Sequence, residues 1–424
     1  MRYSIYKNIT EIFEPLIKLW LYIRLWRGKE DKNRFSERLG YSKIPRPKGL
    51  VVWLHAASVG EANSVLFLIE QLQTGFPETN ILLTTGTVTS AELIKKKNLK
   101  NVIHQFVPID TVRATNRFLY HFRPNVGIWV ESELWPNLVI NARGRGCFLT
   151  IINGRMSEKS YNTWQKYGKA TIAQMLECFE LIFAQSEGDA NRFRSLGAAD
   201  VRCVGNLKYD AINLACNETD LFALKAQIAN RPVWLAASTH AGEEEQLAQA
   251  HDLLLKKYPE LLTIIVPRHP KRGIEIVDIL TKYGKVAMRS KNETISANTS
   301  FYIADTLSEL GIFYRLCEIV FMGGSLVEKG GQNPIEPIRL RCSVITGLST
   351  ENFAEIYSEM EKLQICKKVQ NARELAEQID YLLTNTDILT KNHTIGKEWL
   401  KTKGGAVERI LNILSPIFTP SILK

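Results

Sequence analysis

The sequence lacks the patterns that mark a metal site or a disulfide framework. Its seven cysteines include no C-x-x-C pair, and an odd, scattered set argues against both a disulfide scaffold and a zinc site. The histidines are dispersed, with no H-E-x-x-H motif, and no carboxylate-rich metal loop is present. We therefore expect a protein of a reducing compartment that needs no metal and no cofactor.

Motifs of several enzyme classes are missing as well. There is no G-x-S-x-G motif, and the main glycine-rich stretch has neither G-x-G-x-x-G nor P-loop spacing. These absences disfavour a dinucleotide oxidoreductase and a P-loop kinase. No internal repeat and no low-complexity run is present, so the chain is expected to be an ordinary globular protein.

The N-terminus has neither a cleavable signal peptide nor a run long enough to cross a bilayer, which takes about 20 mostly uncharged residues. The apolar stretch from Ile12 to Trp26 is interrupted by charged residues. Its tryptophans and tyrosine, interleaved and followed by lysines and arginines, are typical of an interfacial membrane anchor. A helix packed on its own domain is the alternative.

Length and charge add two expectations. A chain of 424 residues exceeds what one hydrophobic core usually holds, so two domains are predicted. The formal net charge of +10 favours anionic partners: nucleic acid, acidic lipid headgroups or phosphorylated substrates. The alternative is that the charge serves solubility alone.

Short apolar runs alternate with longer helical patterns along the whole chain. This alternation implies parallel sheets that are covered by helices on both faces. The pattern pauses over residues 209–231, which we take as the domain boundary. We therefore predict two doubly wound domains, one on each side of this boundary. In such sheets ligands bind beyond the carboxyl ends of the strands. The predicted strands are Leu50–His55, Asn80–Thr85, Val102–Val107, Val126–Val130, Phe148–Ile152, Leu181–Gln185, Val201–Val204, Pro232–Ala236, Leu262–Val266, Val286–Met288, Phe301–Ile303, Ile319–Met322 and Ser343–Thr346.

Carboxylates follow two strands of the first half. Glu61 comes after the first strand at an expected helix start, where it could take a proton from a substrate hydroxyl. A first-turn glutamate that complements the helix dipole is the equal alternative. Glu131 and Glu133 follow the fourth strand, and their side chains point to one side if the chain is still extended there. Trp135-Pro136 would open the next helix, and helix capping is the alternative role for the two carboxylates.

Basic side chains offer anion contacts in both halves. Arg155 follows the fifth strand, and Lys208 lies near the end of the first domain; an ordinary surface lysine is the alternative there. In the second half, the run from Pro267 to Arg272 holds four basic-type side chains between and beside two prolines, which suits a phosphate. A solvated basic turn is its alternative.

The strongest signal is the glycine-rich run from Gly323 to Pro337. Such a loop exposes backbone N–H groups, and Pro334 suits the first turn of a helix, so we predict an anion-binding helix start. Glu336 could accept hydrogen bonds from ribose hydroxyls. The segment Asp305–Gly311 offers another helix N-terminus after a strand.

Taken together, these stretches resemble the 3-deoxy-D-manno-octulosonic acid (Kdo) transferases of Gram-negative bacteria. The resemblance covers nearly the whole chain, and its motifs are long and occur in order. The matching runs are His55–Glu61, Glu131–Asn137, Gly205–Asp210, Ser238–His240, Pro267–Pro270 and Gly323–Glu336.

The resemblance implies a GT-B glycosyltransferase with two Rossmann-like domains that face a central cleft. It implies an inverting transfer of Kdo from CMP-Kdo to a lipid A precursor (lipid IVA) at the cytoplasmic side of the inner membrane, without a metal and without nucleic acid as a partner. The implied domains are a membrane anchor over 1–30, an acceptor domain over 31–212 and a CMP-Kdo-binding domain over 213–424, with a possible return of the last helix left open.

The resemblance also assigns residue roles. It places the general base on Glu61 and transition-state stabilisation on Glu131 and Lys208. It places the CMP contacts on Pro267, Arg268, Leu307, Ser308, Glu309, Asn333, Pro334, Ile335 and Glu336. One departure is Gly347-Leu348-Ser349, where the family often has Gly-Pro-His.

Two rival functions remain. One is another GT-B enzyme, a transferase or an epimerase, that uses a UDP-sugar. The other is a non-catalytic basic protein that docks on acidic membranes, which would explain the charge and the N-terminus but not the carboxylates at the strand ends.

Overall fold

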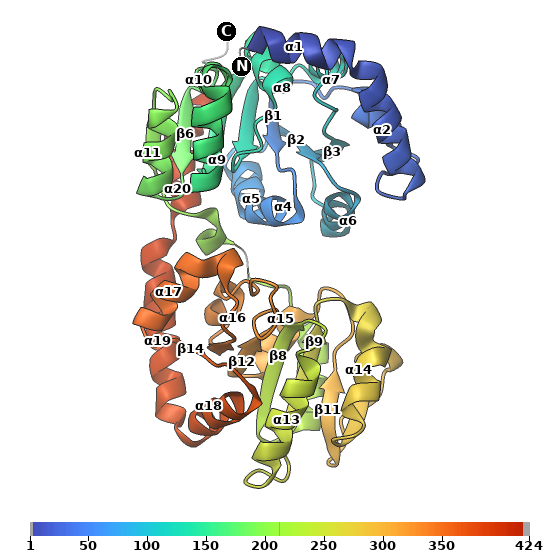
Figure 1. Ribbon diagram of the computed structural model, residues 1–424, viewed down its shortest axis with the longest axis vertical. Helices are drawn as coiled ribbons and strands as arrows, with labels where there is room; N and C mark the ends of the chain where they lie inside the picture. Colours follow the sequence, from blue (N-terminus) through green and yellow to red (C-terminus); the bar gives the residue numbers. More distant parts are fainter. Residues whose placement is uncertain (1–2, 212, 419–424) are drawn as a thin grey trace. The chain divides into compact units, whose positions relative to one another are not determined.

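The computed structural model describes residues 3–211 and 213–418 and divides into two compact units (Figure 1). We call them the N-terminal unit (Met1–Ile212 and Lys403–Lys424) and the C-terminal unit (Asn213–Thr402). Residue 212, at the predicted domain boundary, lies outside the described residues. The last helix, α20, belongs to the N-terminal unit, so the chain leaves that unit once and returns to it.

The N-terminal unit is built on a seven-stranded parallel sheet with the order β3-β2-β1-β4-β5-β6-β7. The strand order reverses between the neighbours β1 and β4, which makes their carboxyl ends the switch point of the sheet. The strands are β1 (Val51–His55), β2 (Asn80–Thr85), β3 (Val102–Phe106), β4 (Val126–Val130), β5 (Phe148–Gly154), β6 (Leu181–Ala184) and β7 (Val201–Cys203).

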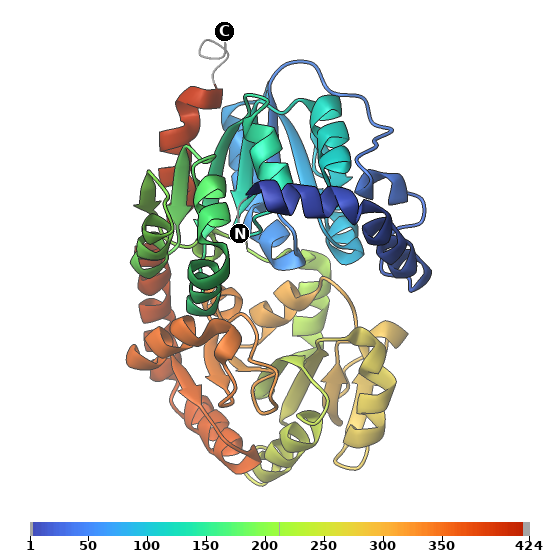
Figure 2. The same cartoon turned by 45° about the horizontal axis from the view of Figure 1, so that its top comes forward.

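Helices cover both faces of this sheet, as Figures 1 and 2 show. Alternate side chains of β1 enter two separate cores: Trp53 packs with residues of α7 and α8, and Leu54 packs with residues of α5 and α20. The helices are α1 (Tyr3–Ile12), α2 (Glu14–Trp26), α3 (Phe35–Arg38), α4 (Val59–Ser64), α5 (Leu66–Gly75), α6 (Val88–Lys97), α7 (Val112–Phe122), α8 (Pro136–Arg143), α9 (Glu158–Thr163), η1 (Trp164–Gly168), α10 (Lys169–Leu176), α11 (Glu187–Ser195), η2 (Leu207–Asp210) and α20 (Ala406–Phe418).

The C-terminal unit repeats the architecture with a second seven-stranded parallel sheet, in the order β10-β11-β9-β8-β12-β13-β14. Its switch point lies between β8 and β12. The strands are β8 (Val233–Thr239), β9 (Leu262–Pro267), β10 (Lys285–Met288), β11 (Thr299–Ile303), β12 (Ile319–Met322), β13 (Ser343–Thr346) and β14 (Cys366–Lys368).

The helices of the C-terminal unit alternate with these strands and bury a core around Trp234, Phe301 and Phe321. The predicted α/β class with two doubly wound sheets is therefore confirmed. The helical segments are α12 (Glu218–Ile228), α13 (Glu244–Leu255), η3 (Pro270–Arg272), α14 (Gly273–Leu280), η4 (Arg289–Lys291), α15 (Leu310–Leu316), α16 (Ile335–Arg339), η5 (Glu351–Phe353), α17 (Ala354–Lys362), α18 (Ala372–Thr384) and α19 (Thr386–Lys403).

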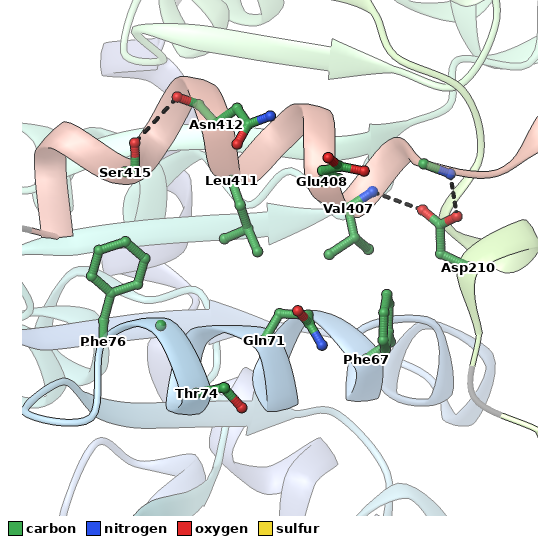
Figure 3. Close-up of a pocket in the computed structure, with 12 residues that line it drawn as sticks. Phe67, Gln71, Thr74, Phe76, Asp210, Val407, Glu408, Leu411, Asn412 and Ser415 are labelled. Atoms are coloured by element: carbon green, nitrogen blue, oxygen red, sulfur yellow. Dashed lines mark hydrogen bonds between the residues drawn. The ribbon is translucent and has the colours of Figure 1, made fainter.

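The returning helix α20 is fixed to the N-terminal unit at its first turn. Both carboxylate oxygens of Asp210 accept backbone N–H groups there, from Gly405 at 2.5 Å and Val407 at 2.7 Å. Figure 3 shows the pocket of ≈ 530 Å³ that remains between α20 and α5, with Phe76 and Leu411 beside it. Asp210 thus sets the point at which the chain rejoins this unit.

The two N-terminal helices expose apolar side chains. Leu21 of α2 is buried against Ile109 and the start of α7, while Ile12 is 73% exposed and Trp26 is 86% exposed. The further exposed large apolar side chains of this segment are Ile5, Ile9, Phe13, Leu16, Leu19, Trp20, Tyr22 and Ile23. Over the described ranges, the model contains no helix with the length and apolar character required to cross a membrane.

Candidate functional site

Glu61 lies at the switch point of the N-terminal sheet, just after β1, in the first turn of α4. Ser58 caps this helix, since its Oγ accepts the N–H of Glu61. The Glu61 carboxylate turns back and accepts hydrogen bonds from the Ala57 N–H at 2.8 Å and the Ser58 hydroxyl at 2.7 Å. Glu61 therefore lies in the first turn of α4, the position considered for a glutamate that complements the helix dipole, and its carboxylate is bonded to the two residues before the helix.

These two hydrogen bonds do not remove the acid–base potential of Glu61. Its side chain is only 6% exposed, and this burial raises the pKa of Glu61 to about 7 in spite of the two hydrogen bonds, with smaller contributions from the negative charges of Glu131 and Glu133. A carboxyl group with a pKa near neutral can accept a proton from a hydroxyl and still exist in its ionised form at physiological pH.

Glu131 and Glu133 lie on the loop that follows β4, the neighbour of β1. The condition for the two side chains to point to one side, an extended chain, is not met, because Glu131 has a φ of 61°, in the left-handed region. The charge of Glu131 nevertheless acts on Glu133, since burial and the Glu131 charge both raise the pKa of Glu133. The predicted opening of the next helix at Trp135-Pro136 is confirmed, because α8 begins at Pro136.

Lys208 brings a positive charge to the same place. It lies on η2, and its Nζ is 3.9 Å from Oε1 of Glu131. The position of η2 is set by side-chain amides: Asn206 accepts the N–H of Lys208, and Asn153 accepts the N–H of Leu207. The tertiary structure therefore gathers Glu61, Glu131, Glu133 and Lys208 from segments up to 147 positions apart, whereas Arg155 is exposed on the adjoining loop.

In the C-terminal unit, Pro267 ends strand β9 and Arg268 follows it. Arg268 is exposed, and its N–H donates to the carbonyl of Thr239 at the end of β8. His240 follows Thr239, and its ring lies 6.0 Å from that of His269. Burial and the neighbouring His269 both lower the pKa of His240. The predicted basic turn after β9 therefore lies beside the switch point of this sheet.

The segment before α15 is held by an ion pair. Arg289 donates to both carboxylate oxygens of Glu309, at 3.0 and 2.7 Å, and these bonds lower the pKa of Glu309. Leu307 is 63% exposed, and Ser308 has a φ of 68°. Leu307 and Ser308 are therefore presented to solvent, while the Glu309 carboxylate is already engaged within the unit.

The glycine-rich run departs from expectation. The N–H groups of Gly324, Ser325 and Leu326 all donate to the buried carboxylate of Glu243, at 2.7, 3.0 and 3.0 Å. The prediction that this loop leaves its N–H groups for a ligand is wrong at these positions, because an internal anion already accepts them. The N–H of Gly330 is likewise taken by the Ser349 hydroxyl, in the stretch that departs from the family pattern.

Asn333 and Pro334 lead into the five-residue helix α16, which begins with Ile335 and Glu336. The Asn333 side chain accepts the N–H of Ile335 at 3.2 Å and donates to Glu336 at 3.3 Å. Burial raises the pKa of Glu336. Within the described part of the chain, no group of three or more His, Cys, Asp or Glu side chains is arranged to hold a metal ion.

Comparison with known proteins decides the family. The family model described as 3-deoxy-D-manno-octulosonic-acid transferase matches residues 33–211, and the model of glycosyl transferases group 1 matches residues 230–399. The 3-deoxy-D-manno-octulosonic acid transferase of Haemophilus influenzae is 34% identical over 97% of both chains. The chain belongs to the Kdo transferase family. A probable mitochondrial Kdo transferase of Arabidopsis thaliana is 36% identical over 93% of this chain and 91% of its own.

This Kdo transferase also shares its fold with more distant enzymes. The UDP-GlcNAc 2-epimerase of Neisseria meningitidis has a TM-score of 0.60 and 16% identity, and the match covers 87% of this chain and 100% of the epimerase. At that identity the likeness concerns the fold alone. The GT-B class predicted for the chain is thus confirmed, and the chain is a glycosyltransferase.

Sequence reasoning gave no role to Glu243, although it lies in the run that follows β8. Gly242-Glu243-Glu244 follows Ser238-Thr239-His240 after one intervening residue, Ala241, so adjacent carboxylates near a strand end were the available signal. Glu243 and Glu244 are both 0% exposed. Glu244 pairs with Arg272 at 2.7 Å and accepts the Thr239 hydroxyl at 3.0 Å, so the two carboxylates serve different segments.

Proposed function

We propose that this Kdo transferase moves Kdo from CMP-Kdo to a lipid A precursor, with inversion at the anomeric carbon. The observation that carries the proposal is the cluster of Glu61, Glu131 and Lys208 at the switch point of the N-terminal sheet, in a chain of this family. A displacement of this type needs a base for the acceptor hydroxyl and cations for the anionic donor.

Glu61 is the general base in this proposal. Its buried carboxylate, with a pKa raised to about 7, takes the proton of the acceptor hydroxyl as the oxygen attacks the anomeric carbon of Kdo. The bond from that carbon to the phosphate of CMP breaks, and CMP leaves with the electron pair. The direction of attack, opposite to the leaving group, inverts the configuration.

Lys208 and Glu131 stabilise the transition state in this proposal. The ammonium group of Lys208 compensates negative charge on the donor, and the carboxylate of Glu131, 3.9 Å from Nζ, orients it. The C-terminal unit holds the CMP through Pro267, Arg268, Leu307, Ser308, Glu309, Asn333, Pro334, Ile335 and Glu336. No metal ion takes part in the proposed transfer.

The N-terminal helices place the enzyme at its acceptor. We propose that the exposed apolar side chains of α1 and α2 enter the cytoplasmic side of the inner membrane, where residues 1–30 act as an interfacial anchor. Residues 31–212 then bind the acceptor and residues 213–402 bind CMP-Kdo. The basic balance of the chain favours the acidic surface on which a phosphorylated lipid lies.

The test is transfer itself. Purified protein is incubated with CMP-Kdo and a lipid A precursor, and the mass of the lipid product is measured by mass spectrometry. A mass increase by Kdo, with release of CMP, supports the proposal. An unchanged lipid mass together with turnover of another activated sugar would refute it.

A UDP-sugar enzyme is the rival function, because the fold shared with the UDP-GlcNAc 2-epimerase does not by itself distinguish the two donors. Thermal unfolding in the presence of CMP and of UDP separates the two functions, because a ligand stabilises the state that binds it. The proposed donor predicts the larger rise in Tm with CMP, and a larger rise with UDP favours the rival.

A further inference from the structure

Glu243 is a fully buried carboxylate at the switch point of the C-terminal sheet. It directly precedes α13, and its two oxygens accept four backbone N–H groups. Oε2 accepts from His240 at 2.9 Å and Gly324 at 2.7 Å, and Oε1 accepts from Ser325 and Leu326, each at 3.0 Å. Three consecutive N–H groups around one carboxylate form the kind of concave nest that otherwise holds a bound anion.

These four hydrogen bonds join two loops that are far apart in the sequence. His240 follows β8, and the other three donors follow β12, its neighbour in the sheet. The loops touch directly: a Cβ at Gly323 would lie 2.5 Å from the Ser238 carbonyl oxygen, so only glycine allows this approach. Glu243 therefore holds together the loops after β8 and β12, which can approach this closely only in the arrangement that the glycine allows.

The arrangement extends from the turn held by Glu243 to the segment proposed to bind CMP. The carbonyl of Gly324 accepts the N–H of Gly331 at 2.8 Å, and the Gln332 side chain lies 3.2 Å from the His240 ring nitrogen. Asn333 to Glu336 follow at once. A displacement of the turn at Gly324 would thus shift the backbone immediately before Asn333.

We propose that Glu243 is a positioning residue for the nucleotide donor. Its carboxylate occupies the N–H nest of the glycine turn as a built-in anion, and so fixes the 330–336 segment before CMP binds. The inference rests on the proposed function, because it takes CMP as the ligand of that segment. It also explains why a glycine-rich loop in this chain does not present its first N–H groups to a phosphate.

The neighbouring carboxylate provides a matched control. Glu244 is equally buried but contacts Arg272 and Thr239, with no hydrogen bond to the glycine turn among the described residues. A variant at Glu244 therefore removes a comparable buried carboxylate without releasing the turn. If Glu243 contributed only to stability as a buried charge, variants at Glu243 and at Glu244 would have the same affinity for CMP.

The test compares Glu243→Gln with Glu244→Gln in the full chain, by calorimetric titration with CMP and by transfer kinetics. Loss of hydrogen bonds to a charged group predicts that Glu243→Gln weakens CMP binding and raises KM for CMP-Kdo by roughly tenfold or more, while kcat at saturating donor changes little. Glu244→Gln is expected to bind CMP as the wild type does. Equal CMP affinity in wild type and Glu243→Gln overturns the inference.

Two further variants keep the inference testable if Glu243→Gln does not fold. Glu243→Asp retains the charge one methylene farther from the donors, and CMP affinity is expected to fall by several-fold; an unchanged affinity counts against positioning. In Glu243→Ala, added formate should restore CMP binding by entering the nest, and failure of formate to do so in a folded protein contradicts the built-in anion. Absence of CMP binding in the wild type would instead refute the proposed donor.

Discussion

The hydroxyl of Tyr6 donates to Oδ2 of Asp110 over 2.9 Å, and this bond ties helix α1 to the loop between β3 and α7 of the N-terminal unit. The Asp110 carboxylate also accepts the N–H groups of Asn137 and Leu138 in the first turn of α8. That helix begins just beyond the loop that carries Glu131 and Glu133. A helix proposed to lie on the membrane is thus bonded to the start of the element that follows two of the site carboxylates.

Removing the Tyr6 hydroxyl should destabilise the protein measurably. Tyr6→Phe deletes a donor to a buried carboxylate, and we expect the free energy of unfolding to fall by about 1–3 kcal/mol. Urea unfolding followed by circular dichroism measures the change. Tyr381→Phe is the control, because Tyr381 on α18 is 47% exposed. The free energy of unfolding of this variant should lie within about 0.5 kcal/mol of the wild-type value. Equal stability of all three proteins would contradict the importance of the bond.

Asp110 should also give the fold a pH dependence. Burial raises the pKa of Asp110 to about 6 from a value near 3.8, so the folded protein binds its proton more tightly than the unfolded chain. The contribution of Asp110 to stability is therefore present below pH 4 and is lost as the pH rises from about 4 to about 6. In Asp110→Asn this part of the slope should disappear when unfolding free energies are measured across that range. An identical slope in both proteins would contradict it.

The pH dependence of the transfer rate should show the ionisation of Glu61. A base with a pKa of about 7 must be deprotonated to act, so kcat/KM should rise with pH and level off above about pH 7. Glu61→Gln should lower the rate by roughly 10²–10⁴-fold and leave the CMP affinity unchanged. A wild-type rate in Glu61→Gln would remove Glu61 from the mechanism. Measuring CMP binding by calorimetry distinguishes loss of chemistry from loss of the donor site.

Lys208 and Glu131 should act as a unit. Lys208→Ala is expected to lower kcat by roughly 10²–10³-fold, the effect of losing one group that stabilises transition-state charge. Because the two side chains are 3.9 Å apart, the double variant with Glu131→Gln should lose less than the sum of the single effects. Lys159→Ala, at an exposed position of α9, is the control and should transfer normally. Full additivity would show that the pair is not coupled.

Membrane binding should depend on the exposed side chains of α1 and α2. Trp26→Ser and Ile12→Ser each remove apolar area that would enter the bilayer interface, and each should weaken binding to vesicles containing phosphatidylglycerol by roughly tenfold. Phe222→Ser is the matched control, because Phe222 is 77% exposed but lies on α12 of the C-terminal unit. Co-sedimentation measures the binding. Equal losses in all three variants would contradict a specific N-terminal anchor.

Local sequence patterns predicted the elements well. The apolar runs located the strands from β1 to β13 to within a few residues, because strands buried on both faces are continuously hydrophobic. The predicted opening of α8 at Trp135-Pro136 is found as well, since a proline suits the first turn of a helix. The strand β14 was missed, since Cys366-Lys367-Lys368 is short and carries two lysines. These successes and this miss depend only on neighbours along the chain.

Two departures from the sequence pattern have a shared physical cause. Glu131 and Glu133 would point to one side only in an extended chain, but the chain turns into the left-handed region where it leaves β4. The glycine turn was expected to offer its N–H groups to a ligand, but Glu243, more than 80 positions earlier, accepts them. Residue type indicates which groups can donate or accept a hydrogen bond, but it does not show which partner each group has in the folded protein.

By itself the sequence determined the fold class, the family resemblance and the residue types of the site. The alternation of apolar runs with helical patterns and the order of the motifs depend only on neighbours along the chain. Only the tertiary structure decided that Glu61, Glu131 and Lys208 meet at one switch point, and that an internal carboxylate fills the glycine turn. The physical reason is that a parallel sheet places the ends of distant strands side by side, and burial there then sets which charges and hydrogen bonds each group has.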